Sequence, residues 1–446
     1  MADDKTVATT LPEALHRRFK ARTADLNTNM SAVILEAITE WVGDWGLNTV
    51  EYTVRQGDTL GRIASRFYGD ASKFRVIAYF NDIADPNLLE VGQVLLIPEP
   101  TQIPAEPPLA VLRPDESPFI YGIHDPGGED LMRQAGVTGW ILYTTLVNEP
   151  PQDFTALTNE GFGVLVRLNW GYNPNGTLPH ESRYAEFANL CADWVRRSRG
   201  VSHWIIANEP NLRSERPGFG TLDEQAITPR RYANAFRLCR AAIRNVAGHE
   251  DDQVITAAVA PWNVDTPYSA DPQGAYGANP TGNWIQYFRD MLLALEGDLD
   301  GIAIHTYTHR VNLNTGDTFI TSEDRRWPDL FPATGGAHFH FRAYQDFMHA
   351  IPESLRHLPV YITETNQDSD PATGATWFTQ NLGWVQQAYA EIDRWNQNPG
   401  NQKIRALLLY RWRRQGEGGD RWGFSHNEGV KQDFRQALQH RYRWIS

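Results

Sequence analysis

Two short stretches decide the fold of this chain: His203-Trp204-Ile205-Ile206-Ala207-Asn208-Glu209-Pro210-Asn211 and Pro359-Val360-Tyr361-Ile362-Thr363-Glu364-Thr365-Asn366. Each is a short apolar run that ends in a glutamate, as expected for a buried strand of a parallel sheet. In a parallel barrel the carboxyl ends of the strands meet at one face, and that face carries the chemistry. Cleavage of a glycosidic bond needs two converging carboxyl groups, and Glu209 and Glu364 are the predicted pair.

The rest of residues 118–446 repeats this strand pattern. The predicted strands cover residues 119–123, 139–147, 163–168, 203–207, 254–260, 300–305, 359–363 and 404–410. Helical patterns such as 182–198, 230–246, 283–296 and 376–394 lie between them. Eight near-continuous apolar strands that alternate with helices predict parallel pairing and a (β/α)8 TIM barrel. A doubly wound open sheet is the competing fold, but its glycine-rich Gly-x-Gly-x-x-Gly turn is absent, as is a P-loop.

Counting strands places Glu209 at the end of strand 4 and Glu364 at the end of strand 7. Residues 119–446 thereby resemble clan A of the glycoside hydrolases, whose acid/base follows strand 4, usually behind an asparagine, and whose nucleophile follows strand 7. The resemblance implies a retaining hydrolase of a β-linked glycan. Glu364 would attack the anomeric carbon, Glu209 would protonate the leaving oxygen, and Asn208 would bind the 2-hydroxyl. Retention requires carboxyl groups about 5–5.5 Å apart.

Other residues at predicted strand ends fit a sugar site. In the same resemblance, an aromatic or histidine side chain after strand 6 bonds to the nucleophile and a tryptophan after strand 8 lies beneath the reacting sugar. The predicted substrate-binding residues are therefore Asn208, His305, Tyr307, Trp412, Arg167, Asn169 and His124.

A second copy of the tripeptide, Asn148-Glu149-Pro150, follows only strand 2, and we predict a loop there. No cofactor or metal is expected, because His338 and His340 lack a convincing third ligand.

Composition narrows the classes of partner. The 446 residues carry a formal net charge of -13, which disfavours nucleic acid as the main partner. The two cysteines, Cys191 and Cys239, lie on apolar helical stripes and are predicted to be core thiols rather than a disulfide framework. The sequence contains no run of 18 apolar residues, so no membrane span is predicted. The N-terminus shows no secretory signal, so we expect synthesis in the cytoplasm and delivery to a cell wall or the extracellular space by lysis or injection.

Residues 1–47 form the first predicted segment, a strand over residues 6–11 followed by helices over 12–25 and 31–42. Leu11-Pro12-Glu13 and Asn29-Met30-Ser31-Ala32 resemble a ribbon-helix-helix domain, a family that dimerises through its strand. The family usually reads DNA with outward side chains of that strand, here Thr6, Ala8 and Thr10. These lack the basic groups that recognise bases, so DNA binding is disfavoured and a homodimerisation or docking role is expected. A plain two-helix extension is the alternative.

Residues 48–99 form the second predicted segment, in the order strand, helix, helix, strand. Gly57-Asp58-Thr59-Leu60, Asn81 and Gly92-Gln93-Val94-Leu95-Leu96-Ile97-Pro98 resemble a LysM domain. The resemblance implies binding of polymers that contain N-acetylglucosamine, such as peptidoglycan or chitin. The implied groove residues are Gly57, Asp58, Thr59, Leu60, Asn87 and Leu88. An assembly role in a phage-tail-like machine is the alternative for this module.

A linker is predicted over residues 100–117, because the stretch from 98 to 114 contains six prolines and should be stiff and extended. Together the segments predict a cell-wall- or chitin-directed glycosidase with a glycan anchor. The alternatives are a non-catalytic glycan-binding or assembly protein and a DNA-binding regulator. The sugar stays open, since the LysM resemblance favours N-acetylglucosamine whereas Asn208 suits a free 2-hydroxyl.

Overall fold

The computed structural model describes residues 49–68, 73–81, 83, 89–98, 112–113, 115–309, 312, 315–327, 335–367, 376–378, 380–413 and 421–445. Its contacts divide the chain into two compact units, Met1–Ala110 and Val111–Ser446. The predicted ribbon-helix-helix segment at 1–47 and most of the predicted linker lie outside the described residues.

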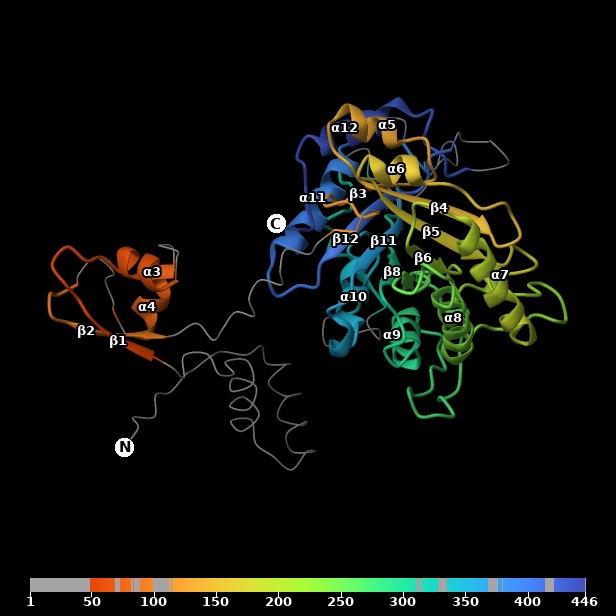
Figure 1. Ribbon diagram of the computed structural model, residues 1–446, viewed down its shortest axis with the longest axis horizontal. Coiled ribbons are helices and arrows are strands. Elements are labelled where there is room, and N and C mark those ends of the chain that lie inside the picture. Colours follow the sequence, from red (N-terminus) through yellow and green to blue (C-terminus); the bar gives the residue numbers. More distant parts are fainter. Residues whose placement is uncertain are drawn as a thin grey trace. The chain divides into compact units, whose positions relative to one another are not determined.

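The smaller unit pairs two strands and two helices around its own core (Figure 1). Its elements are β1 (Thr49–Thr53), α3 (Leu60–Tyr68), α4 (Phe74–Phe80) and β2 (Val94–Pro98). The strands pair antiparallel. Leu60, Ile63 and Ile77 of the helices pack on Leu95 and Ile97 of β2, which confirms the predicted strand-helix-helix-strand order.

The larger unit is a parallel eight-stranded barrel, as predicted. Its strands are β3 (Tyr121–His124), β4 (Trp140–Leu146), β5 (Gly163–Asn169), β6 (His203–Ile206), β7 (Gln253–Ile255), β8 (Ile302–His305), β11 (Val360–Thr365) and β12 (Ile404–Leu409). They pair in the order β7-β6-β5-β4-β3-β12-β11-β8. Backbone bonds from Asp300 to Val254 and from Thr256 to Gly301 join the two outer strands, so the sheet closes.

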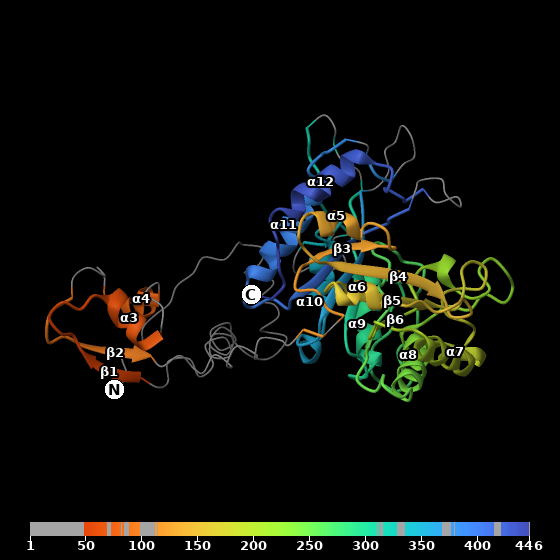
Figure 2. The ribbon, with the colours of Figure 1, turned by 45° about the horizontal axis from the view of Figure 1, so that its top comes forward.

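A helix follows each barrel strand and covers its outer face (Figures 1 and 2). These helices are α5 (Glu129–Gln134), α6 (Thr155–Asn159), α7 (Tyr184–Arg197), α8 (Pro229–Arg244), α9 (Trp284–Ala294), α10 (Ala343–Ala350), α11 (Trp384–Gln397) and α12 (Glu428–Leu438). Two short strands, β9 (Arg325–Arg326) and β10 (Ala337–His338), pair in the loop after β8. The predicted core thiols, Cys191 of α7 and Cys239 of α8, are both buried and free.

Side chains of each barrel strand alternate between two cores. Trp140, Ile205 and Tyr361 point into the barrel, where the rings of Trp140 and Tyr361 meet with centroids 5.3 Å apart. Gly163 is required beside them, because a Cβ there would lie 2.4 Å from the Trp140 ring.

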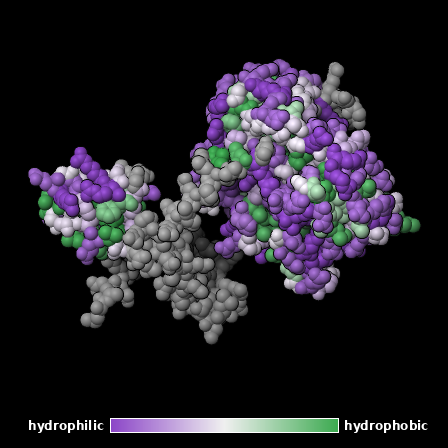
Figure 3. Space-filling model, in the orientation of Figure 1, coloured by the Kyte–Doolittle hydropathy of each residue, from purple (hydrophilic) through white to green (hydrophobic). Residues whose placement is uncertain are grey.

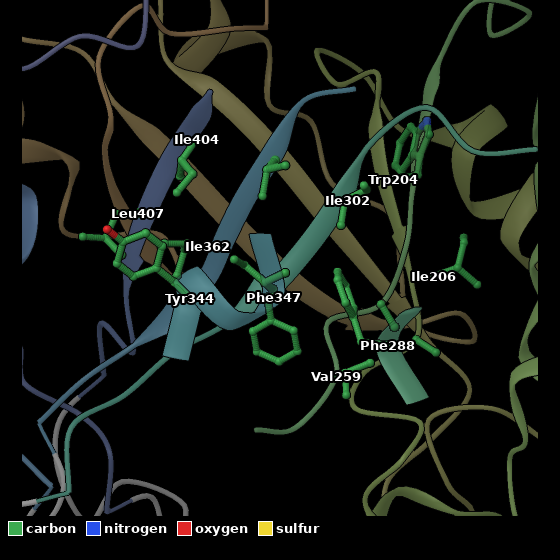
Figure 4. Close-up of a cluster of buried hydrophobic side chains, with 14 of the residues drawn as sticks. Trp204, Ile206, Val259, Phe288, Ile302, Tyr344, Phe347, Ile362, Ile404 and Leu407 are labelled. Carbon is green, nitrogen blue, oxygen red and sulfur yellow. The ribbon is translucent and has the colours of Figure 1, made fainter. Parts of the chain in front are cut away.

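The alternate side chains form the layer between barrel and helices. Ile206, Ile302 and Ile362 lie there with Phe288 of α9 and Phe347 of α10 (Figure 4). Most of the visible surface of the barrel unit is hydrophilic (Figure 3).

Candidate active site

The predicted catalytic residues reach one face of the barrel. Glu364 lies in β11, the seventh barrel strand, and Glu209 lies three residues beyond the end of β6, the fourth. His124 ends β3, Arg167 lies in β5 and His305 ends β8. Because all of these positions are at carboxyl ends of parallel strands, their side chains converge.

Glu364 is held by two donors. Arg167 Nη1 donates to its Oε1 at 2.6 Å, and the Tyr307 hydroxyl donates to its Oε2 at 3.0 Å. Its side chain is only 8% exposed. Burial opposes ionisation, but the permanent charge of Arg167 and its hydrogen bond hold the pKa of Glu364 well below its usual range. Glu364 is therefore a carboxylate at neutral pH.

His305 connects the two glutamates. Its Nδ1 lies 2.8 Å from Glu209 Oε1, and its Nε2 lies 3.8 Å from Glu364 Oε1. Arg167 Nη2, which can only donate, lies 3.2 Å from the same Nε2. The hydrogen-bond network therefore assigns the acceptor role to Nε2 and the proton to Nδ1, which donates to Glu209.

The backbone around Glu209 is strained. Ala207 and Glu209 both have left-handed conformations, with φ of 66° and 39°. Between them, Asn208 accepts a hydrogen bond at its carbonyl from the Thr177 hydroxyl, and the Glu209 N–H donates to the Ala258 carbonyl at 3.0 Å. These bonds hold a conformation that costs non-glycine residues of order 1–3 kcal/mol, and such strain is common at functional sites.

A pocket of about 610 Å³ opens above these groups. Oδ1 of Asn208 and Nδ2 of Asn366 are buried and have no hydrogen-bond partner among the described residues, so both can serve a polar ligand. The side chains that line the pocket are those of His124, Asp125, Thr144, Arg167, Asn169, Tyr172, Asn208, Glu209, Leu212, Ser214, Glu215, Trp262, Tyr307, His309, Glu364, Asn366, Tyr410, Arg411, Arg413, Arg421 and Trp422.

The structure brings most of the predicted substrate-binding residues together. His124, Arg167, Asn169, Asn208 and Tyr307 line the pocket, and His305 lies beneath it in contact with both glutamates.

Trp412 does not line the pocket. Its indole covers Gly127 and Gly128, where a Cβ would lie within 2.8 Å of ring atoms, and packs on Phe424. Tyr410 and Trp422 supply the aromatic surface on that side.

The pocket also contains residues that the sequence did not single out. Glu215 belongs to a short 3-10 helix (Arg213–Glu215) in the loop after β6. Burial, followed by the charges of Glu209 and Glu364, raises the pKa of Glu215 to about 8. Tyr172 and Trp262 add further aromatic surface. The only signal for these residues was the length of the loops that carry them.

Glu149 occupies a different environment from Glu209. It follows β4, the second barrel strand, as predicted, and its Oε2 accepts bonds from the Thr145 hydroxyl at 3.0 Å and from the Leu146 N–H at 3.3 Å. The second Asn-Glu-Pro copy thus stabilises its own loop.

Among the described residues, no group of three or more His, Cys, Asp or Glu side chains is placed to hold a metal ion. His338 instead pairs with Asp346, at 2.9 Å. No helix in the described part of the chain is both long and apolar enough to cross a membrane.

The predicted glycan groove of the smaller unit is partly visible. Gly57 and Thr59 are exposed, whereas Asp58 accepts bonds from the Tyr52 hydroxyl and the Arg55 N–H. Leu60 is 1% exposed and belongs to the core, so its side chain is not available to a ligand. Asn87 and Leu88 lie outside the described residues.

Comparison with known proteins identifies this smaller unit. Residues 52–98 match the family model described as LysM domain. Residues 52–98 form a LysM domain. An esterase of Mycobacterium tuberculosis is 61% identical over 46 residues, which are 10% of this chain and 10% of the esterase. An N-acetylmuramoyl-L-alanine amidase of Bacillus subtilis is 38% identical over 88 residues, 19% of this chain and 27% of the amidase. These similarities are local, since the chain spans about a tenth of the length of the esterase.

Solved structures resemble the chain at low identity. A glucosidase from Croceicoccus marinus has 11% identity and a TM-score of 0.42, over 73% of this chain and 69% of that chain. A family 44 endoglucanase from Clostridium thermocellum has 12% identity and a TM-score of 0.41, over 73% of this chain and 75% of that chain. At these values the similarity concerns the fold alone.

Proposed function

We propose that the barrel is a retaining glycoside hydrolase of a β-linked glycan and that the LysM domain anchors it to a polymer containing N-acetylglucosamine. One observation carries the proposal: Glu209 and Glu364, at the ends of the fourth and seventh barrel strands, contact the two nitrogens of one imidazole in a polar and aromatic pocket. A site that only bound sugar would have no need for two carboxyl groups in this arrangement.

Glu364 is the proposed nucleophile. Arg167 and Tyr307 fix both of its oxygens and keep it ionised, so it can attack the anomeric carbon to form a glycosyl-enzyme. The same donors would stabilise the carboxylate when it is released in the second step.

Glu209 is the proposed acid/base. Its Oε1 accepts from His305, which leaves Oε2 to carry the proton that is delivered to the leaving oxygen. After the leaving group departs, the same oxygen can take a proton from the attacking water. Asn208, whose buried Oδ1 has no partner among the described residues, is proposed to bind the 2-hydroxyl of the reacting sugar.

Hydrolysis by the purified protein tests this function. The panel would contain peptidoglycan, chitin oligomers and aryl β-glucosides, β-galactosides and β-xylosides. Glu364→Gln should abolish turnover on whichever substrate is cleaved. Glu209→Gln should slow substrates with poor leaving groups by about 10²–10⁴-fold, the usual contribution of a general acid, and slow activated aryl glycosides much less.

Glu149→Gln is the matched control, because it changes the same tripeptide outside the pocket. The anomeric configuration of the first product, followed by proton NMR, should equal that of the substrate. An inverted product would refute the retaining mechanism. Silence across the panel, with LysM-dependent pull-down on peptidoglycan intact, would favour a non-catalytic glycan-binding protein.

A further inference from the structure

Trp262 forms one wall of the pocket. It lies in the loop after β7, the fifth barrel strand, and is half-buried. Its indole Nε1 donates to the His338 carbonyl at 2.8 Å. Two residues earlier, Ala260 exchanges two hydrogen bonds with the side-chain amide of Asn211, at 2.8 and 2.9 Å. Asn211 is the second residue after Glu209, so these two bonds join the loop of Trp262 to the loop of the proposed acid/base.

The backbone of Trp262 is strained, and its ring is held by neighbours that do not stack on it. Its φ is 60°, a left-handed value that bulky residues seldom adopt and that is common at functional sites. Three rings of the described residues contact the indole, with centroids 4.2 to 6.4 Å away and planes inclined by 53° to 59°. They are those of Tyr307, His309 and Phe339. Because none of them is parallel to the indole, the surface that Trp262 presents to the pocket can be covered by a flat ligand ring.

Asn366 supplies a polar group in the same quarter of the barrel. It is the first residue after β11, two positions beyond Glu364, and both side chains line the pocket. Its carbonyl accepts from the Thr308 N–H at 3.2 Å, between the pocket-lining Tyr307 and His309. Asn366 is 2% exposed, and its Nδ2 has no hydrogen-bond partner among the described residues. A buried donor without a partner is costly, so this amide is suited to an acceptor that arrives with the ligand.

An aromatic surface beside one amide donor matches the two sides of a sugar ring. The faces of a pyranose carry C–H groups, which pack on the negative face of an indole. Its edge carries hydroxyl or acetamido oxygens, which can accept from Asn366 Nδ2. The hydroxyl of Tyr307 donates to Glu364, and the Tyr307 ring lies 6.4 Å from the indole of Trp262. One aromatic residue therefore separates Trp262 from the nucleophile, which suits the neighbour of the reacting sugar rather than the reacting sugar itself.

We propose that Trp262 and Asn366 form a second sugar-binding site, the Trp262 subsite, which takes the ring next to the one that is attacked. The ligand is then a chain of two or more β-linked pyranoses and not the glycoside of a single sugar. The inference rests on the proposed function in taking the ligand to be a glycan whose reacting sugar lies at Glu364.

Calorimetry on Glu364→Gln in the whole chain tests the subsite without hydrolysis. Four series of β-1,4-linked oligosaccharides are used, built from glucose, xylose, galactose and N-acetylglucosamine. In each series the affinity of the pentasaccharide is compared with that of the methyl glycoside of the single sugar. We expect the pentasaccharide of at least one series to bind about tenfold or more tightly, because only the longer ligand reaches the nucleophile and Trp262 together.

Substitutions added to Glu364→Gln then locate this preference for length. Trp262→Ala should lower the affinity ratio of pentasaccharide to methyl glycoside by about tenfold, and Asn366→Ala by about fivefold. Trp262→Phe keeps an aromatic face and should retain more of the ratio than Trp262→Ala. The LysM domain is the same in every variant, so its contribution to the N-acetylglucosamine series does not change between them.

Trp170→Ala is the matched control. Trp170 is also half-buried and follows β5 at the same end of the barrel, but it packs on Phe187, with ring centroids 6.2 Å apart, and does not line the pocket. Its substitution should leave the ratio unchanged.

Three results would overturn the inference: no pentasaccharide that binds more tightly than its methyl glycoside, a ratio that survives both Trp262→Ala and Asn366→Ala, or an equal loss in Trp170→Ala. If Trp262→Ala does not fold, Trp262→Phe and Asn366→Ala decide between these outcomes. The result is separable from that of the proposed function. A preference for length that depends on Trp262, without hydrolysis by the unsubstituted protein, would retain the subsite and refute the hydrolase. Hydrolysis without a preference for length would do the reverse.

Discussion

Replacing Arg167 by glutamine tests the electrostatic logic of the site most directly. Arg167 is 3% exposed and gives Glu364 its shortest hydrogen bond, at 2.6 Å. Glutamine keeps much of the volume and removes the charge. Glu364 would then stay buried with only the Tyr307 hydroxyl donating a hydrogen bond to it.

The expected shift follows from the charge that is lost. Two unit charges about 4 Å apart interact by about 4 kcal/mol at an effective dielectric constant of about 20. At about 1.36 kcal/mol per unit, this corresponds to a rise of about 3 units in the pKa of Glu364. Because the hydrogen bond from Tyr307 remains, we expect the acidic limb of kcat/KM to move upward by about 2–3 units.

The substitution should also lower the free energy of unfolding. The folded pKa of Glu364 is depressed, so the group contributes stability that is present above its unfolded pKa and lost as the pH falls through the folded value. Removing one partner of a buried ion pair costs about 3–5 kcal/mol. The variant should therefore be less stable than the wild type at neutral pH, and the difference should shrink in acid.

The assay is the pH dependence of kcat/KM, with urea unfolding at neutral and acidic pH. Arg230→Gln is the control, because Arg230 makes an equally short pair with buried Asp271, at 2.6 Å, outside the pocket. The Arg230→Gln control should lose stability, but the acidic limb of its kcat/KM profile should stay where it is in the wild type. A folded Arg167→Gln protein with an unmoved acidic limb would refute the role assigned to this arginine.

Three further predictions concern groups outside the Arg167–Glu364 pair. Because the folded pKa of Glu215 is raised to about 8, the wild type loses stability as the pH rises from the unfolded value of 4.5 toward 8. The melting temperature of Glu215→Gln should thus rise relative to wild type between acidic and alkaline buffers, and a constant difference would contradict this. His203 is fully buried against Asp115, at 2.9 Å; burial lowers its pKa, but the carboxylates of Asp115 and Glu116 raise it by more. Its contribution is therefore complete below its unfolded pKa and lost as the pH rises through the folded one, so His203→Ala should cost about 3 kcal/mol in acid and less in alkali, measured by urea unfolding at both. In the LysM domain, the Asn81 amide bonds to both the N–H and the carbonyl of Leu96, and Asn81→Ala should cost about 2 kcal/mol. On heating, the Asn81→Ala variant should bind peptidoglycan more weakly than the wild type but hydrolyse small glycosides at the same rate. An equal loss of binding and hydrolysis would contradict the independence of the LysM domain and the barrel.

Periodicity and strand counting were sufficient to predict the barrel. Each predicted strand overlaps an observed one, because a buried parallel strand needs a continuous apolar run and this sequence supplies eight. The fifth strand is shorter than predicted: 254–260 was expected and β7 is Gln253–Ile255. Beyond it, Ala257 N–H donates to the Tyr232 hydroxyl and Ala260 N–H to Asn211 Oδ1. Side chains rather than a neighbouring strand therefore satisfy that backbone, which no local pattern could reveal.

The site was predictable where strands supply its residues and unpredictable where loops do. Glu364 and Arg167 lie within strands, so their position in the barrel followed from counting. Trp412 lies beyond β12, and its ring direction depends on a surface offered by Gly127 and Gly128. Glu215 and Arg421 reach the pocket through loop conformations that depend on tertiary contacts.

The left-handed conformation of Ala207 separates two otherwise identical tripeptides. Asn-Glu-Pro occurs at 148–150 behind Val147 and at 208–210 behind Ala207. A β-branched side chain makes a positive φ a genuine outlier, whereas alanine tolerates it at a modest cost. Val147 could not make the turn that Ala207 makes before its glutamate. The amino acid in front of an Asn-Glu-Pro tripeptide thus helps to distinguish, in a sequence, a copy that can adopt the backbone of residues 207–209 from one that cannot. In related barrels, valine or isoleucine at this position would therefore indicate that the following glutamate does not take the backbone position of Glu209.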